Sequence, residues 1–295
     1  MADTRPEWSL YRTFLSVFRS GSLSAAAREE GLTQPTVGRH VDALEKALGV
    51  ALFIRSQHGL SPTEAAVELL PYAQSLEATA AALVRAAVGR AGIRGTVRIT
   101  ASEVVGGEVL PPILSELHQA HPELVIELVL SNRTEDLLRR EADIAVRMVR
   151  PTQQALVVRH VGDIGLGLHA RRDYLERRGT PLNVEELRAH TLIGFDRETA
   201  FIRSVRARGF AIERGMFALR SDSDLAQLAA LRAGFGIGVC QVPLARRSPD
   251  LVRVLPESFL FKLEVWIVMH SELRSSARCR VVADALAEGL AAYAE

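Results

Sequence analysis

The chain has 295 residues, a formal net charge of +1 and 48% hydrophobic residues. This length accommodates two or three packed units, and the balanced charge argues against an architectural DNA-binding protein, which needs a strongly basic surface. No apolar run approaches the length of a membrane span, and the first residues lack the apolar core of a signal peptide. We therefore expect a cytoplasmic protein without a membrane partner.

The first informative region predicts a helix-turn-helix followed by a wing. Ala27 is small enough to let two helices approach, Gly31 suits the turn, and Val37 packs the second helix against the first. Thr33 is the expected N-cap of that second helix. A plain turn between two buried helices is the alternative, and it is disfavoured because apolar residues keep helical spacing on both sides of the turn. The expected buried stripe of the second helix is Val37, Val41, Leu44 and Leu48, and the expected wing strands are Val50–Ile54 and Gly59–Ser61.

Side chains at the start of the second helix are suited to reading DNA, because this end of a recognition helix enters the major groove. Gln34 fits an adenine edge, Arg39 fits guanine or a phosphate, and Thr36 fits a thymine methyl group or a phosphate. For each of them, an ordinary exposed position is the alternative. The candidate DNA-binding residues are Ser24, Thr33, Gln34, Pro35, Thr36, Arg39 and, in the wing, Arg55 and His58.

The segment after the wing, Pro62–Ala91, is rich in alanine and predicts one long helix. Leucine and alanine alternate along it at intervals of four and three residues, the spacing of a helix-pairing seam. We expect this helix to form a dimer interface; a helix buried in its own domain is the alternative. The residues of the expected seam are Leu69, Ala73, Leu76, Ala80, Leu83 and Ala87.

From Thr96 onward, short apolar strands alternate with helices, which predicts parallel βαβ units and an α/β domain of two halves. Ligands of such open sheets bind at the carboxyl ends of the strands, in the crevice between halves. The expected strands are Val97–Thr100, Val125–Leu130, Ile144–Met148, Val157–Val161, Ile164–His169, Ile237–Cys240 and Leu263–His270, and the main expected helices are Leu110–Ala120, Glu135–Arg140, Ser223–Ala233 and Ser276–Tyr293.

Polar residues follow several of these strands and are expected to meet in one crevice. Ser102 and Glu103 follow the first strand at the start of a helix, where backbone N–H groups hold anions. Arg147 ends the third strand, where its guanidinium would pair with a ligand carboxylate or, equally, with an acid such as Asp143. We therefore expect a small polar or carboxylate-bearing effector. Its candidate binding residues are Ser102, Glu103, Asn132, Thr134, Arg147, Phe195, Asp196, Ser221 and Asp222.

Catalysis and metal binding are not expected. No nucleophile elbow, phosphate-binding loop, zinc-protease helix or dinucleotide fingerprint occurs in a matching context. His118 and His121 lack a third ligand at metal spacing, and Cys240 and Cys279 are isolated, which favours buried structural thiols over a redox switch. We expect no cofactor. A solute-binding protein is the remaining alternative, and the lack of an export signal disfavours it.

The chain resembles the LysR-type transcriptional regulators along essentially its full length. The resemblance rests on GSLSAAA and GLTQPTVGRHVDALEKALGVALF in the first region, on VRITAS, HPELVIEL and EADIAVR in the second, and on DSDLAQLAALRAGFGIGVCQVPLA in the third. One departure is Gly38, where the family usually has a serine; glycine removes a hydroxyl that would contact phosphate and costs about 1 kcal/mol of helix propensity relative to alanine.

The resemblance implies a mixed fold with three parts: a mainly α winged helix-turn-helix at 1–62, a linker helix and hinge at 63–94, and a two-lobed α/β domain like a periplasmic binding protein at 95–295, with its second subdomain at about 162–265. It also implies a sequence-specific regulator of transcription controlled by a small-molecule co-inducer bound between the lobes. The implied partners are double-stranded DNA at dyad-symmetric promoter sites, further copies of the chain in a homodimer or homotetramer, and RNA polymerase.

Overall fold

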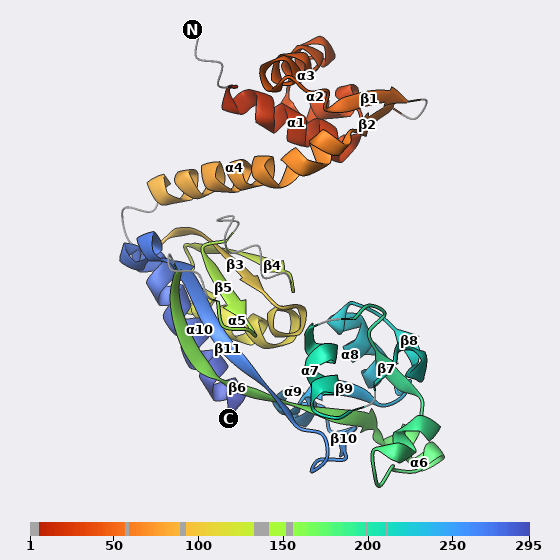
Figure 1. Cartoon of the computed structure of the whole chain (residues 1–295). Coiled ribbons are helices and arrows are strands. Elements are labelled where there is room, and N and C mark those ends of the chain that lie inside the picture. The colour runs from red at the N-terminus through yellow and green to blue at the C-terminus, as the bar shows by residue number, and fades with distance from the viewer. Residues whose placement is uncertain are drawn as a thin grey trace. The chain divides into compact units, whose positions relative to one another are not determined.

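The computed structural model describes residues 6–56, 59–88, 93–132, 142–151, 156–198, 200–210 and 212–295. The described chain forms two compact units, one ending at Ala86 and the other comprising the residues that follow (Figure 1). The expected helix Glu135–Arg140 and the candidate residues His58 and Thr134 lie outside the described residues. Within those ranges, no helix is long and apolar enough to cross a lipid bilayer.

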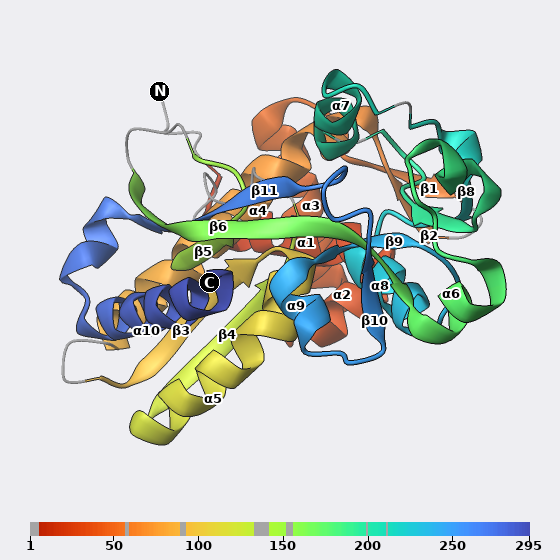
Figure 2. The same cartoon turned by 90° about the horizontal axis from the view of Figure 1, so that it is seen from below.

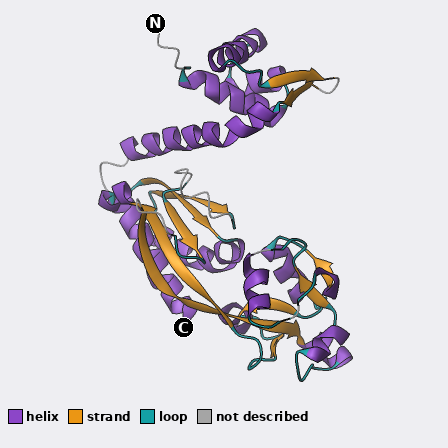
Figure 3. Cartoon of the chain, viewed as in Figure 1, coloured by secondary structure: helices purple, strands orange, loops and turns teal. Residues whose placement is uncertain are grey.

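The N-terminal unit is a winged helix-turn-helix, mainly helical with one short hairpin (Figure 3). Ala27 and Val37 are buried between its helices, and Gly31 takes the turn with φ of +66°, as the sequence predicts. The elements are α1 (Trp8–Ser20), α2 (Leu23–Glu30), α3 (Gln34–Leu48), β1 (Phe53–Ser56), β2 (Gly59–Pro62) and α4 (Glu64–Val88).

The wing is fixed to the end of α1 by two glycines. The backbone N–H of Leu60 donates to the carbonyl oxygen of Gly21 at 2.9 Å. A Cβ atom on Gly59 would lie only 2.7 Å from that oxygen, so a residue with a side chain could not lie this close to the Gly21 backbone. The hairpin is therefore held against the helices at its base by the backbone itself.

Three expectations for this unit are wrong in detail. The first wing strand begins at Phe53 rather than Val50, because the last helix turn ends at Gly49 and a short connection follows. Pro62 belongs to β2 and not to the long helix, since Thr63 caps that helix by accepting a hydrogen bond from Ala66 N at 3.2 Å. Leu48, expected in the buried stripe, lies in the last turn of α3 and is 36% exposed.

The expected pairing seam of α4 divides into two stretches. Ala73 is fully buried and Leu69 half-buried, because the first half of α4 packs on the core of its own unit. Leu76 and Leu83, farther along, are 46% and 67% exposed. The assignment of Ala73 to an intermolecular seam is therefore wrong, whereas the second stretch remains free for a partner.

The C-terminal unit is built on a mixed sheet of seven described strands in the order β10-β6-β11-β5-β3-β4, with β9 paired to β6. As predicted, β3 runs parallel to β4 and β5, and α5 and α10 pack on one face of these strands. The elements are β3 (Gly95–Ala101), α5 (Leu110–Ala120), β4 (Leu124–Leu130), β5 (Ile144–Arg147), β6 (Leu156–Arg171), α6 (Arg172–Arg178), β7 (Leu192–Gly194), α7 (Ala200–Ala207), β8 (Phe217–Arg220), α8 (Asp224–Arg232), β9 (Gly238–Gln241), α9 (Val242–Arg246), β10 (Leu251–Val254), β11 (Phe261–His270) and α10 (Ala277–Ala294).

Two long strands join the two lobes of this unit. The strands β6 and β11 run side by side from the first lobe, with β3 to β5 and α10, into the second lobe, with α6 to β10 (Figures 1 and 2). The two expected strands Val157–Val161 and Ile164–His169 are therefore one strand, and that expectation is wrong. The glycine and aspartate at 162 and 163 do not break β6, because a shift in its pairing with β11 between Val265 and Trp266 absorbs the irregularity.

Candidate functional site

The start of α3 presents a small polar surface to solvent. Gln34, Pro35 and Arg39 are exposed there. The hydroxyls of Thr33 and Thr36 are hydrogen-bonded at 2.8 Å, and Arg39 Nη2 donates to Thr36 Oγ1 at 3.3 Å. Thr33 occupies the N-cap position, but its side chain makes no capping hydrogen bond and contacts Thr36 instead. This pairing orients Arg39 beside the helix end that a recognition helix inserts into DNA.

Several acids that balance the charge of the N-terminal unit are already engaged in holding it together. Glu29 accepts a hydrogen bond from Ser16 at 2.6 Å, and Glu30 pairs with Arg12. Glu45 accepts hydrogen bonds from the backbone N–H groups of Leu52 and Phe53, at 2.6 and 3.1 Å. These carboxylates lie on α2 and in the later turns of α3. The first turn of α3 contains no acidic residue.

Two other candidates for DNA contact lie on neighbouring elements. Ser24 is exposed in the first turn of α2, whose N-cap, Ser22, accepts a hydrogen bond from Ala25 N. The backbone of Arg55 belongs to β1 of the wing. The helix end, the start of α2 and the wing are the three parts that this motif uses against a duplex.

Replacing Gly38 by alanine is expected to stabilise the N-terminal unit by about 1 kcal/mol, because glycine is a poor helix former. A Cβ atom at this position would lie 4.0 Å from Leu23 Cδ1, an ordinary contact. Thermal unfolding should show a rise of roughly 4–8 °C for a unit of this size. Gly31→Ala is the matched control and should lower the melting temperature, since Gly31 has a φ of +66°. A Gly38→Ala variant that melts no higher than the wild type would contradict the prediction.

In the C-terminal unit, the two lobes meet at the N-terminus of α8. Glu103 of the first lobe accepts hydrogen bonds from Ser223 Oγ at 2.8 Å and from the backbone N–H of Leu225 at 3.3 Å. Asn132 accepts a hydrogen bond from the N–H of Glu103 at 3.1 Å and donates to Asp224 at 3.0 Å. Glu103 and Asn132 thus meet as the sequence predicts, but Glu103 itself occupies the anion position of a helix N-terminus.

The contact at the N-terminus of α8 brings two carboxylates together. Burial raises the pKa of Asp224, and the nearby charge of Glu103 raises it further, while the hydrogen bond from Asn132 opposes the change. A third carboxylate at this place would be repelled by both. The sequence pattern places Ser223 at the start of the expected helix, where serine is a common N-cap, but it carries no signal for Asp224.

A second contact joins the lobes at the other end of α8. The carboxylate of Glu108 accepts two hydrogen bonds from Arg232, each at 2.7 Å, and the backbone oxygen of Glu108 accepts one from Arg247 at 3.3 Å. The hydrogen bond from Arg232 lowers the pKa of Glu108. Bidentate pairs of this kind are among the stronger ion pairs in proteins. The sequence around Glu108 does not predict this ion pair, because Arg232 lies over a hundred residues away in the chain.

The remaining polar candidates of the second lobe build its own loops. Asp222 accepts hydrogen bonds from the backbone N–H groups of Asp196 and Arg197, at 3.1 and 2.9 Å. Asp196 pairs with Arg214 at 2.6 Å. The carbonyl oxygen of Ser221 accepts a hydrogen bond from Gln227 Nε2 at 2.7 Å. These contacts hold the segment after β7 against the start of α8.

Arg147 and Ser102 lie in the first lobe. The guanidinium of Arg147 is buried and donates to Thr100 Oγ1 and to the carbonyl oxygen of Val146, both at 3.1 Å. The carbonyl oxygen of Ser102 accepts a hydrogen bond from Gly106 N at 2.8 Å and so begins the following helix. These two hydrogen bonds join Arg147 to the sheet.

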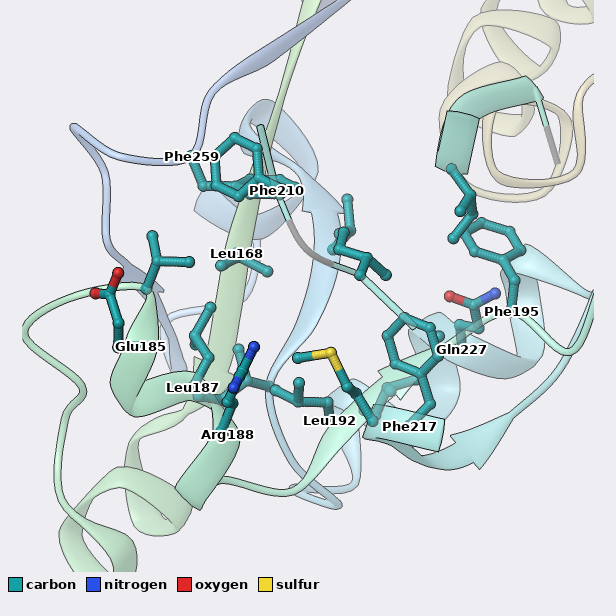
Figure 4. A pocket seen from close by; sticks show the side chains of 18 of the residues that line it. Leu168, Glu185, Leu187, Arg188, Leu192, Phe195, Phe210, Phe217, Gln227 and Phe259 are labelled. Atoms are coloured by element: carbon teal, nitrogen blue, oxygen red, sulfur yellow. The ribbon is translucent and has the colours of Figure 1, made fainter. Parts of the chain in front are cut away.

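Phe195 takes a different position from the other candidates. It lines a cavity of about 290 Å³ inside the second lobe, together with Phe217 and Gln227 (Figure 4). All residues around this cavity lie between Leu168 and Phe259, so the first lobe contributes none of its described side chains. The expected single crevice is therefore two separate places: the contact at α8 and this cavity.

Both cysteines lie in the interior of the C-terminal unit. Cys240 and Cys279 are both buried, and burial raises the pKa of the Cys240 thiol to about 11. A thiol with so high a pKa stays protonated, which is the reverse of what a redox-active cysteine needs. The described part of the chain contains no group of three or more His, Cys, Asp or Glu side chains placed to hold a metal ion.

Comparison with known proteins identifies both units. Residues 8–67 match the model of the bacterial regulatory helix-turn-helix of the lysR family, and residues 90–291 match that of the LysR substrate binding domain. A probable HTH-type transcriptional regulator, LtrA of Klebsiella pneumoniae, is 28% identical over 286 residues, which cover 93% of this chain and 92% of that protein.

Solved structures agree in fold. CrgA, a LysR-type regulator from Neisseria meningitidis, is 25% identical and superposes with a TM-score of 0.60 over 97% of this chain and 99% of its own. CbnR, another regulator of the family, is 20% identical and gives a TM-score of 0.69 over 98% and 99% of the two chains. Two family models that together span nearly the whole chain leave no other assignment: the protein belongs to the LysR family of transcriptional regulators, which have a helix-turn-helix DNA-binding domain and an effector-binding domain and are not enzymes.

Proposed function

We propose that this regulator binds dyad-symmetric promoter sites and reads their bases with the start of α3. The observation that carries the proposal is the group of exposed Gln34, half-buried Thr36 and exposed Arg39, with Arg39 held by the Thr36 hydroxyl at 3.3 Å. Gln34 is suited to adenine and Arg39 to guanine. We place the protein in the cytoplasm, where promoter DNA is found. RNA polymerase, which uses the same promoters, is the proposed further partner.

The proposed effector is a small polar molecule that binds between the lobes and needs no other cofactor. The two lobes are joined through α8 by Glu103 at one end and Glu108 at the other. A ligand that drew Glu103 away from Ser223 would release one of these contacts and change the preferred arrangement of the lobes. Because the carboxylates of Glu103 and Asp224 already lie there, a ligand that donates hydrogen bonds to them suits this place better than one that adds a third carboxylate.

The proposed dimer interface is the stripe of exposed Leu76 and Leu83 with half-buried Ala80 between them on α4. Large apolar side chains at helical spacing lose water contact when two such helices pair. In this reading two copies place two recognition helices side by side, which matches a dyad-symmetric site. Affinity then comes from two modules with few phosphate contacts each, in agreement with the nearly balanced charge of the chain.

The double substitution Leu76→Glu with Leu83→Glu is expected to convert the oligomer into a monomer. Each carboxylate would be buried without a partner in the paired state, at a cost of several kcal/mol. Sedimentation velocity at micromolar concentration measures the result. Gln74→Glu with Ala81→Glu adds the same charge to exposed positions on the other side of α4 and should leave the oligomer intact. A double leucine variant that still sediments as an oligomer would rule out this interface.

Selection of genomic fragments by the purified protein, with sequencing of the bound DNA, tests the proposal as a whole. A few enriched sites with paired, inverted half-sites would support a specific regulator, and the neighbouring genes would suggest the effector. Uniform recovery of fragments would indicate architectural binding and contradict the proposal. No recovery would leave only a small-molecule binder and also contradict it.

A further inference from the structure

The cavity inside the second lobe is too large to be a packing defect. Interiors of proteins contain few voids larger than a water molecule. This cavity measures about 290 Å³, roughly twice the size of an engineered cavity of about 150 Å³ that takes up benzene. Its volume therefore corresponds to one or two aromatic rings. An empty apolar space of this size lowers the stability of the folded protein. A ligand that fills it buries its own apolar surface and that of the cavity walls.

The walls of the cavity are almost entirely apolar and aromatic. Phe210 and Phe259 meet edge to face, with ring centroids 5.2 Å apart, and form one wall. On another side, the ring of Phe217 lies directly over Gly194, where a Cβ atom would overlap it. Leu168 of β6 lies at the back of the view (Figure 4). Such surroundings suit a flat apolar molecule that packs against ring edges and faces.

One fixed polar group belongs to this wall. Gln227 is 7% exposed, and its Nε2 donates to the carbonyl oxygen of Ser221 at 2.7 Å. That bond fixes the orientation of the amide, yet Oε1 accepts no hydrogen bond from any residue that the structure describes. Figure 4 shows this oxygen turned toward Phe217. An acceptor that opens onto an apolar cavity and has no donor there favours a ligand that supplies one.

The cavity also has a way in. Glu185, Arg188 and Gly209 line it and are exposed, so they mark the place where it reaches the surface. Neither the Glu185 nor the Arg188 side chain makes a hydrogen bond or ion pair with the described part of the chain. The two opposite charges leave the entrance without a net charge, which suits a neutral ligand.

From these observations we infer that the second lobe holds a ligand site of its own, separate from the contact at α8, for a neutral aromatic molecule of one or two rings with a single hydrogen-bond donor. The donor binds Gln227 Oε1, and the rings pack among Phe210, Phe217 and Phe259. Because Gln227 belongs to α8, the occupied site touches the same helix that joins the lobes. The inference does not depend on DNA binding, so it stands or fails separately from the proposed function.

Calorimetric titration of the full-length protein with indole, and with indene as its counterpart without a donor, tests the site. We expect one saturable indole site per chain and a binding constant for indene about 2- to 10-fold weaker, the usual value of one hydrogen bond. Gln227→Met should abolish the difference between the two probes. Met216 also lines the cavity, and Met216→Trp should abolish binding of both probes by filling it. Leu182→Trp, at a residue that is 82% exposed in the same lobe, should change neither.

Absence of saturable binding in the wild type would overturn the site, and equal affinities for the two probes, or an unchanged difference in Gln227→Met, would overturn the role of Gln227. Circular dichroism shows whether the variants fold. Should either variant fail to fold, wild-type crystals soaked with indole decide the matter: density between Phe217 and Gln227 supports the site, and an empty cavity overturns it.

Discussion

Arg39→Ala is expected to weaken binding to the selected operator by roughly 5- to 150-fold, the range of 1–3 kcal/mol that one bidentate base contact contributes. The melting temperature should not change. Arg39 is exposed, and its hydrogen bond with Thr36 Oγ1, at 3.3 Å, is a surface contact of little weight for stability. Fluorescence anisotropy with labelled operator DNA measures the affinity, and differential scanning calorimetry measures the stability.

The pattern across operator sequences separates base reading from simple charge. Arg39→Ala should lose discrimination at one guanine position while retaining it elsewhere. Lys46→Ala removes the same charge from the last turn of α3 and should leave the sequence preference intact. An Arg39→Ala protein that folds normally and binds the operator as tightly as the wild type would eliminate Arg39 as a DNA contact.

The C-terminal unit is expected to lose about 3 kcal/mol of stability between pH 7 and pH 4 through one residue, His169. Burial in β6 lowers the pKa of His169 from 6.5 to about 4, and the nearby Arg253 lowers it further, against the hydrogen bond between its Nδ1 and the carbonyl oxygen of Gly167 at 2.9 Å. Between pH 6.5 and pH 4, the His169 side chain is protonated in the unfolded chain but remains neutral in the folded chain. Stability is therefore fully present above pH 6.5 and declines as the pH falls toward 4.

Urea unfolding followed by Trp266 fluorescence, in a Trp8→Phe background, measures this dependence in the C-terminal unit. His169→Asn keeps a donor near Gly167 and cannot ionise, so its stability should vary less with pH over this range. His118→Asn makes the same substitution at an exposed position of α5 and is the matched control. Equal slopes for the wild type and His169→Asn would show that other groups cause the acid sensitivity.

The DNA-binding unit could be predicted from the sequence because its determinants are local. The turn needs a glycine at Gly31, and the approach of α2 and α3 needs small and β-branched residues at Ala27 and Val37, all within a few residues of one another. The same holds for α5 and for the parallel strands β3 to β5, whose apolar patterns are complete within each segment. Helix ends and strand ends were less predictable, since Thr63 and Leu48 depend on what packs beside them.

Long-range packing decided the rest. Ala73 of α4 faces the core of its own unit because it packs with Phe14 and Leu44. The spacing of apolar residues within α4 cannot show this, since both partners lie elsewhere in the chain. The continuity of β6 depends on the partner strand β11, a hundred residues later, because paired backbone hydrogen bonds outweigh the weak local preference of a glycine for a break.

The sequence by itself determined the winged helix-turn-helix, the long helix after it, the α/β character of the larger unit and the residues at the start of α3, because short-range sterics and apolar periodicity specify each of them. Only the tertiary structure decided that Glu103 fills the N-terminus of α8, that Glu108 pairs with Arg232, and that Phe195 and Gln227 face a cavity in the second lobe. The physical reason is that a side chain's partner and the space beside it are set by segments far apart in the chain, and those distances exist only after folding.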